Sequence, residues 1–218
     1  MAGTQVVGAF SYGTLPGSGN VRVHDMNRDG RAEIIVGDPL AGQMHLWSRA
    51  NNDAITATSL LAANIVGIDV RGAGDFNGDG KGDILTRTSD GALGLLFTDG
   101  TAVISSAIIA APSGGYFVQG VGDLTGDGVS DILVSRFNGP TNELRLWTMS
   151  NGVILADDLI RPLAAGELVQ LVADFNGDGR SDLLMRSAGN GLSESLMDGK
   201  SISQTVPLFS VTSNTLVF

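Results

Sequence analysis

Short aliphatic runs recur four times along the chain, and each directly follows a polar, glycine-containing loop. The core of each run is a pair of adjacent residues: Ile34-Ile35, Ile84-Leu85, Ile132-Leu133 and Leu183-Leu184. Unbroken aliphatic pairs after a tight loop are typical of a strand that is buried on both faces. No amphipathic segment of helical period longer than about ten residues stands out, so the sequence predicts little helix.

Turn signals divide the rest of each repeat into further strands. The first turn after the aliphatic pair is carried by Asp38-Pro39, Asp90-Gly91, Asn138-Gly139-Pro140 or Gly189-Asn190-Gly191. The strand after this turn is predicted to end at Trp47, Phe97, Trp147 or Leu196. A second hairpin signal, such as Asp99-Gly100, leads into an aliphatic and β-branched run. Each repeat therefore reads as four short strands, with the polar loop between the first and the second.

The polar loops open at Asp25, Asp75, Asp123 and Asp174, which lie 50, 48 and 51 residues apart. A four-stranded sheet cannot bury both faces alone, whereas stacking repeats of about fifty residues around an axis buries them. We predict an all-β, β-propeller-like single domain over residues 1–218, made of four-stranded antiparallel sheets. The units span approximately 17–63, 64–111, 112–161 and 162–209.

Each end of the chain carries one predicted strand that belongs to no complete unit. Residues 5–15 resemble a fourth strand with no unit before it, and residues 212–218 resemble a first strand with no loop after it. Unpaired strand edges favour pairing with another strand. The sequence leaves open whether the ends close a ring of four units, whether the units form part of a larger ring, or whether the end strands exchange between chains of a homo-oligomer.

The loops carry the pattern of a calcium site. Oxygen-bearing side chains stand at positions 1, 3, 5 and 9, glycine stands at position 6, and position 7 would contribute a backbone carbonyl. Calcium takes six to eight oxygen ligands, which alternating side chains on a curled loop supply. The predicted ligands of up to four structural Ca²⁺ ions are Asp25, Asn27, Asp29, Arg31 and Glu33; Asp75, Asn77, Asp79, Lys81 and Asp83; Asp123, Thr125, Asp127, Val129 and Asp131; and Asp174, Asn176, Asp178, Arg180 and Asp182.

The four loops are not equivalent as ligand sets. The second and fourth are the fullest, whereas Glu33 is one methylene longer and Thr125 offers only a neutral oxygen. The first and third sites should therefore bind calcium no better than the others. An EF-hand is excluded, because its loop requires glutamate at position 12 and flanking helices. Position 12 is Val36, Thr86, Val134 or Met185 in these repeats.

Composition narrows the function classes. The formal charge is −10, and twelve of the 23 acidic residues lie in the loops, so four bound Ca²⁺ ions would reduce the charge to −2. The acidity thus reflects metal sites and argues against nucleic acid as a partner. The sequence contains no run of about 18 apolar residues, the length that a membrane-spanning helix requires, so no membrane span is predicted. The chain has no cysteine, which excludes disulfides. The N-terminal residues lack the basic start of a secretory signal, so we expect any export signal to be removed or to lie elsewhere.

Other candidate residues favour binding over catalysis. His24 and His45 have no nucleophile at useful spacing, so structural roles are expected for them. Trp47 and Trp147 occupy the same position in their repeats as Phe97 and Leu196, which favours packing between sheets over stacking on sugar rings. Tyr116 and Phe137 lie next to turns and are candidates for exposed aromatic residues, and the variable turn 137–142 is a candidate binding segment. No enzyme activity is predicted.

The string D-x-[NT]-x-D-G-x-x-[DE], followed by an aliphatic strand at a spacing of about fifty residues, resembles the FG-GAP/VCBS repeats of calcium-binding β-propellers. That family includes integrin α-subunit propellers and several fungal and bacterial lectins. The resemblance implies extracellular or cell-surface localisation, structural Ca²⁺, and an adhesion module that binds a glycan or protein partner through loops on a propeller face. The alternatives are a self-assembling structural subunit whose terminal strands pair between chains and, third, a polysaccharide-active enzyme.

Overall fold

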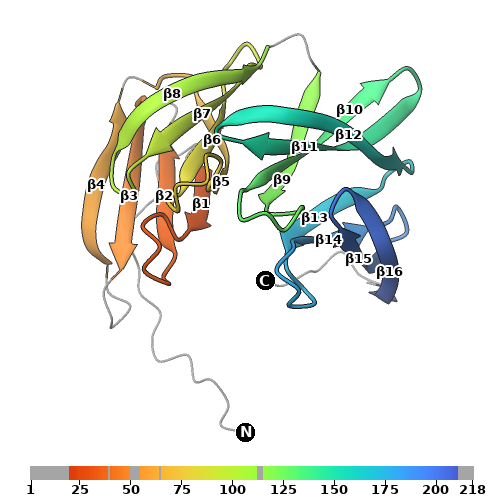
Figure 1. Cartoon of the computed structure of the whole chain (residues 1–218). Helices are drawn as coiled ribbons and strands as arrows, with labels where there is room; N and C mark the ends of the chain where they lie inside the picture. The colour runs from red at the N-terminus through yellow and green to blue at the C-terminus, as the bar shows by residue number, and fades with distance from the viewer. Residues whose placement is uncertain (1–19, 39, 50–54, 64, 112–114, 211–218) are drawn as a thin grey trace, which may run out of the picture.

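The computed structural model describes residues 20–38, 40–49, 55–63, 65–111 and 115–210. All regular structure in these residues is β, which confirms the predicted all-β class. Four antiparallel sheets of four strands lie around a common axis as a four-bladed β-propeller (Figure 1). Within each sheet the strands follow one another in chain order. The described residues contain no helix long and apolar enough to span a membrane.

Each repeat forms one blade. Blade 1 holds β1 (Asn20–His24), β2 (Glu33–Asp38), β3 (Gln43–Arg49) and β4 (Ile55–Ala63). Blade 2 holds β5 (Asp69–Gly74), β6 (Asp83–Arg87), β7 (Leu93–Thr98) and β8 (Val103–Ala110). Blade 3 holds β9 (Tyr116–Gly122), β10 (Asp131–Asn138), β11 (Thr141–Ser150) and β12 (Val153–Leu163). Blade 4 holds β13 (Leu168–Ala173), β14 (Asp182–Arg186), β15 (Gly191–Asp198) and β16 (Ser201–Ser210).

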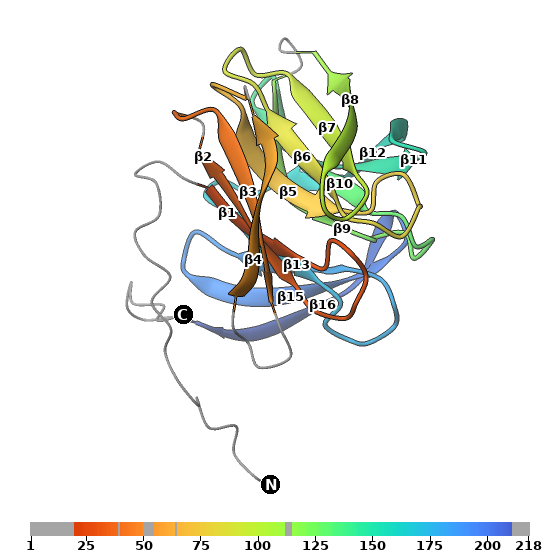
Figure 2. The same cartoon turned by 90° about the vertical axis from the view of Figure 1, so that its left-hand side faces the viewer.

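The first strand of every blade faces the axis of the propeller. Residues of β1, β5, β9 and β13 together line a cavity of about 370 Å³, and the two views at right angles show the outer strands β8 and β16 on the periphery (Figures 1 and 2). The acidic loops follow these inner strands, at one end of every blade. The strand ends that pair Asp69 with Arg87 and Tyr116 with Arg136 lie at the opposite end.

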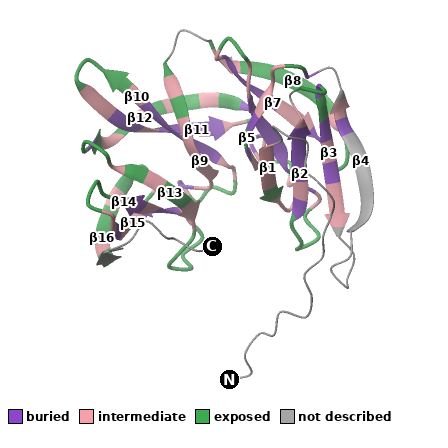
Figure 3. Ribbon diagram, turned by 180° about the vertical axis from the view of Figure 1, so that it is seen from behind, coloured by how far each residue is buried: buried purple, intermediate pink, exposed green. Residues whose placement is uncertain are grey.

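Six of the eight residues in the aliphatic pairs pack between blades, as their pattern predicted. Ile35 of blade 1 and Ile84 of blade 2 belong to one buried cluster. Leu85 of blade 2 and Ile132 of blade 3 share a second, and Leu133 and Leu183 share a third. In blades 2 and 3 the two residues of a pair thus point to opposite neighbours, whereas Ile34 and Leu184 are half-buried and belong to none of the three clusters. The buried residues concentrate on the middle strands (Figure 3).

Glycine allows the inner strands of blades 2, 3 and 4 to approach closely. A Cβ atom added at Gly72 would lie 2.5 Å from Val121 Cγ2, and one added at Gly120 would lie 2.3 Å from Val172 Cγ2. Both distances are shorter than carbon atoms tolerate, and valine has little freedom to turn away because it is branched at Cβ. The glycines of these inner strands therefore set the spacing of the blades.

The substitution Gly120→Ala is expected to destabilise the protein by about 2 kcal/mol, because overpacking a tight contact costs about 1 to 3 kcal/mol. Chemical denaturation measures the loss. In the double variant Gly120→Ala with Val172→Ala, the clash is relieved and part of the stability should return. Gly189→Ala serves as the control, since no atom lies nearer than 4.0 Å to its added Cβ. Equal losses in Gly120→Ala and Gly189→Ala would contradict the close approach.

The surface of blade 4 that faces away from blade 3 differs from the matching surfaces of the other blades. Position 2 of the acidic loop is fully buried in blades 1, 2 and 3, at Met26, Phe76 and Leu124, but Phe175 in blade 4 is 39% exposed. The three buried clusters of the described residues lie at the three junctions between consecutive blades. Blade 4 thus presents an apolar residue that the other blades cover with a following sheet. The predicted end strands 5–15 and 212–218 lie outside the described residues.

Candidate functional site

The four acidic loops adopt one backbone conformation. Glycine at position 6 has a positive φ in every copy, between 81° and 86°, at Gly30, Gly80, Gly128 and Gly179. Position 4 also has a positive φ, at Arg28, Gly78, Gly126 and Gly177. L side chains rarely adopt this conformation, so glycine is favoured at both positions. The sequence prediction identified the bend at position 6 but missed the one at position 4, although glycine stands there in three copies.

The carboxylate at position 1 organises each loop. In the second loop, Asp75 Oδ1 accepts hydrogen bonds from the N–H of Gly78 at 2.7 Å and of Asp79 at 3.2 Å, and Oδ2 accepts one from Gly80 at 2.7 Å. Asp123 accepts the equivalent three bonds in the third loop, and Asp25 and Asp174 each accept two. The chain therefore curls around this carboxylate.

Positions 3, 5 and 7 continue the curl. Asn77 Oδ1 accepts a hydrogen bond from the N–H of Asp79, and Asp79 Oδ1 accepts one from the N–H of Lys81 at 2.7 Å. The position 5 carboxylates of the other loops, Asp29, Asp127 and Asp178, accept the same bond from Arg31, Val129 and Arg180. Hydrogen bonds to its loop lower the pKa of Asp178, so this carboxylate is favoured as the anion.

The acid at position 9 lies in a different environment. Asp83, Asp131 and Asp182 are completely buried, and Glu33 is 1% exposed. Asp131 Oδ2 accepts hydrogen bonds from the N–H groups of Leu124 and Thr125, both at 3.1 Å, and its Oδ1 accepts one from Met149 of β11 at 3.0 Å. The corresponding third-strand donors for Asp83 and Asp182 are Thr98 and Met197. The acid at position 9 therefore links the loop to the third strand of its own blade. The sequence predicted this acid as a calcium ligand and did not predict this link.

Burial disfavours the charged form of these acids. Burial raises the pKa of Asp83 and of Asp131 to about 6, although the hydrogen bonds that stabilise the two anions lower it. Repulsion from Asp79 and Asp75 adds to the raised pKa of Asp83, and repulsion from Asp127 adds to that of Asp131. Burial also raises the pKa of Glu33. A nearby cation would offset this penalty.

The donor chemistry of the loops fits calcium. Every predicted ligand atom is oxygen, the donor type that calcium prefers. In the part of the chain that the structure describes, no three His, Asp or Glu side chains are gathered as a ready-made metal site. The predicted calcium ligands therefore lie in four loops of the expected composition and curl, and their coordination of calcium remains a prediction.

Successive loops are joined by backbone hydrogen bonds across the blade junctions. The N–H of Ser130 donates to the carbonyl of Asp75 at 2.6 Å, and the N–H of Ser181 donates to the carbonyl of Asp123 at 2.6 Å. Gly82 donates to the Met26 carbonyl at 2.9 Å in the same way. These donors occupy position 8, which is small in every copy. The sequence showed the small residue, but not that it touches the preceding loop.

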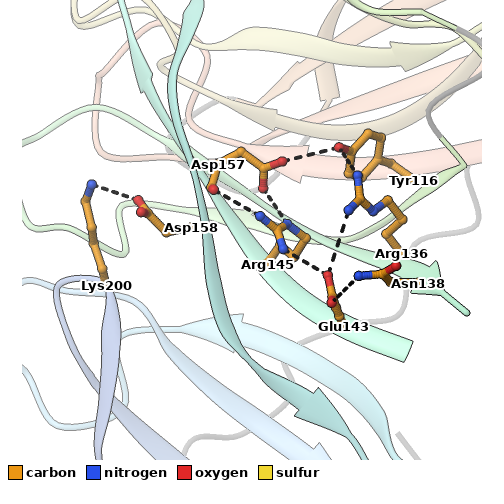
Figure 4. A network of polar contacts seen from close by, with 8 residues as sticks. All are labelled: Tyr116, Arg136, Asn138, Glu143, Arg145, Asp157, Asp158 and Lys200. Atoms are coloured by element: carbon orange, nitrogen blue, oxygen red, sulfur yellow. Dashed lines mark hydrogen bonds and ion pairs between the residues drawn. The ribbon is translucent and has the colours of Figure 1, made fainter. Parts of the chain in front are cut away.

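The end of blade 3 opposite the acidic loops carries a connected set of polar side chains (Figure 4). Arg145 pairs with Asp157 at 2.7 Å and with Glu143 at 2.9 Å. The Tyr116 hydroxyl donates to Asp157 at 3.2 Å and accepts a hydrogen bond from Arg136 at 3.0 Å. The hydrogen bond to Asp157 raises the pKa of Arg145, and one from Asn138 lowers the pKa of Glu143. The network holds Tyr116 at the start of β9.

Aromatic rings lie on both sides of this strand start. Tyr116 packs edge-on against Trp147 with ring centroids 4.5 Å apart, and Trp147 is buried between blades 2 and 3, as predicted. Phe117 points the other way, is 45% exposed, and meets Phe137 edge-on at 6.5 Å. Phe137 is 65% exposed, which agrees with the exposure predicted for it. The Arg87 guanidinium of blade 2 lies 5.5 Å from the Phe117 ring centroid, a cation–π distance.

The two histidines lie in different surroundings. His24 is half-buried at the end of β1, beside Gly82 of the next loop, and burial lowers its pKa despite Asp25 and Asp75. His45 Nε2 lies 3.4 Å from Gln43 Oε1. The structural roles expected for both histidines stay a prediction.

Comparisons with known proteins agree with the fold and the loops. No curated protein matches the chain. Among solved structures, a chain of the Photorhabdus luminescens Tc holotoxin pore is similar over 85% of this chain, with 12% identity and a TM-score of 0.54. The present chain spans only 9% of that chain, so the likeness concerns the fold alone. The FG-GAP-like repeat model matches residues 25–86 and 75–134, which include the first three acidic loops. The chain therefore belongs to the FG-GAP-like repeat family.

Proposed function

We propose that the protein is a calcium-stabilised extracellular propeller that acts as a binding or adhesion module for a glycan or protein partner, without catalysis. The observation that carries this proposal is the exposed aromatic surface at the end of the blades opposite the acidic loops, formed by Phe117 and Phe137. Exposed aromatic residues held in fixed orientations contribute contact area at low entropic cost. Family membership supports the same class of function.

Calcium would act as a structural ion in this proposal. Side chains at positions 1, 3, 5 and 9 and the carbonyls of Arg31, Lys81, Val129 and Arg180 would hold it. When bound, it would neutralise carboxylates that otherwise repel one another. Because each loop is bonded to the next across a blade junction, ordering the loops would also stabilise the junctions.

A glycan array and a screen of extracellular proteins test the binding function. The calcium-loaded protein is expected to bind a specific subset of probes, and Phe137→Ala is expected to weaken that binding at least fivefold. An Ile104→Ala variant is a matched control, since Ile104 is 62% exposed on the outer strand β8. Absence of binding to any glycan or protein probe would contradict the proposal.

A second candidate is a self-assembling structural subunit, and the exposure of Phe175 favours it. The matching residues of blades 1, 2 and 3 are each covered by a following blade, so blade 4 offers a surface suited to another sheet. Light scattering separates this candidate from a simple binding module. A mass of 22.5 kDa at all concentrations would rule out self-assembly.

A further inference from the structure

A polar pocket adjoins the exposed aromatic surface. It has a volume of about 380 Å³ and is lined mainly by polar residues of blade 2 at the end opposite the acidic loops: Asp69, Arg71, Arg87, Thr88, Ser89 and Asp90. We call it the Arg87 pocket. Since Arg87 also contacts the Phe117 ring, the pocket and the aromatic surface share one side chain. They form a continuous surface across the junction of blades 2 and 3.

Both acids that line the pocket have a partner within it, and Asp69 Oδ1 is a buried oxygen without a hydrogen-bond partner. Asp69 pairs with Arg71 at 2.6 Å. Asp90 accepts a hydrogen bond from the Thr88 hydroxyl and one from the N–H of Ala92 at 3.4 Å. Within the described residues, Arg87 takes part in none of the ion pairs. The cation available to a ligand in this pocket is therefore Arg87.

The position of Arg87 suits a ligand that is both anionic and ring-shaped. A guanidinium binds a carboxylate through two parallel hydrogen bonds. Arg87 lies over the Phe117 ring, and Phe137, which is 65% exposed, offers an apolar face beside it against which the C–H groups of a sugar ring can pack. The acidic loops lie at the other end of the blades, away from this cation. A compact anion without a ring would use Arg87 but leave Phe137 uncovered.

We propose that the Arg87 pocket binds an acidic oligosaccharide, with a uronate carboxylate on Arg87 and a sugar ring on Phe137. This assignment rests on the proposed binding function and adds the class of ligand and its site. The network around Arg145 keeps Tyr116, and with it the start of β9, in place beneath the aromatic surface.

Calorimetric titration of the calcium-loaded protein with a glucuronate-containing tetrasaccharide tests the assignment, and the same tetrasaccharide with methyl-esterified carboxylates is the neutral probe. We expect the ester to bind at least tenfold more weakly. Arg87→Gln should weaken binding of the acid at least tenfold, and Phe137→Ala at least fivefold, with unchanged melting temperatures. Arg186→Gln is the control, because Arg186 ends β14 as Arg87 ends β6.

Three results would overturn the assignment. The first is equal affinity for the tetrasaccharide and its methyl ester. The second is an equal loss of affinity in Arg87→Gln and Arg186→Gln. The third is a polyglutamate peptide that binds as tightly as the tetrasaccharide. If the array shows binding of neutral glycans or proteins alone, the proposed function stands and the acidic ligand is wrong. If no array probe and no tetrasaccharide binds, both fail.

Discussion

Removing calcium with a chelator is expected to lower the melting temperature by more than about 10 °C. A site whose Kd lies ten to a hundred times below the ambient calcium concentration contributes about 1.4 to 2.7 kcal/mol, so four sites contribute about 6 to 11 kcal/mol. In a chain of this length, 1 kcal/mol corresponds to about 2 to 4 °C. The expected loss is global, because the loops are bonded to one another across the junctions.

Thermal unfolding followed by circular dichroism, before and after chelation, measures this effect. Calcium added back should restore the transition. Magnesium at the same concentration should restore less, because it requires shorter bonds and a stricter octahedral geometry. A melting temperature that is the same with calcium and with chelator would contradict structural calcium.

The substitution Asp131→Asn is expected to destabilise the protein by about 3 kcal/mol even without calcium. The carboxylate is fully buried and accepts N–H bonds on both oxygens, from the third loop and from Met149. An asparagine amide would place an NH₂ group against one of these donors and leave a buried N–H without an acceptor. The predicted fall in melting temperature is about 6 to 12 °C.

Asp127→Asn is the matched control in the same loop. Asp127 is exposed and accepts one N–H bond from Val129, which the asparagine oxygen can still accept. We expect this variant to melt at a lower temperature than the native protein in calcium and at the same temperature in chelator. If Asp131→Asn were also harmless in chelator, its role in fastening the loop to β11 would be wrong.

The repeat made most of the fold predictable. The aliphatic pairs, the turn residues and the fifty-residue period gave four blades of four strands, and the third strands end within three residues of Trp47, Phe97, Trp147 and Leu196. These features depend on local sequence, where backbone preference and burial act together.

Contacts between blades were less predictable, because one sequence shows the size of a residue but not its neighbour. The small residue at position 8 gave no sign that its N–H bonds to the preceding loop, as Ser130 does to Asp75. Position 2 is apolar in all four copies, yet Phe175 is exposed while Phe76 is buried. The difference arises from the place of each blade in the chain, not from the residue itself.

The candidate binding surface was predicted only in part. Phe137 was expected to be exposed, and it is. Phe117 and Arg87 were not singled out, because their contact joins two blades across about thirty residues of sequence. The repeat pattern predicts that neighbouring blades pack against each other. It does not predict which residues of one blade face which residues of the next, and this alignment decides the contacts of each side chain.

Calorimetric titration of calcium into the chelator-treated protein measures directly whether the loops bind calcium. We expect saturable binding at up to four sites, with the second and fourth loops at least as tight as the others and with loss of one site in Asp178→Asn. A titration without binding heat, together with an unchanged melting temperature on adding calcium, would contradict it.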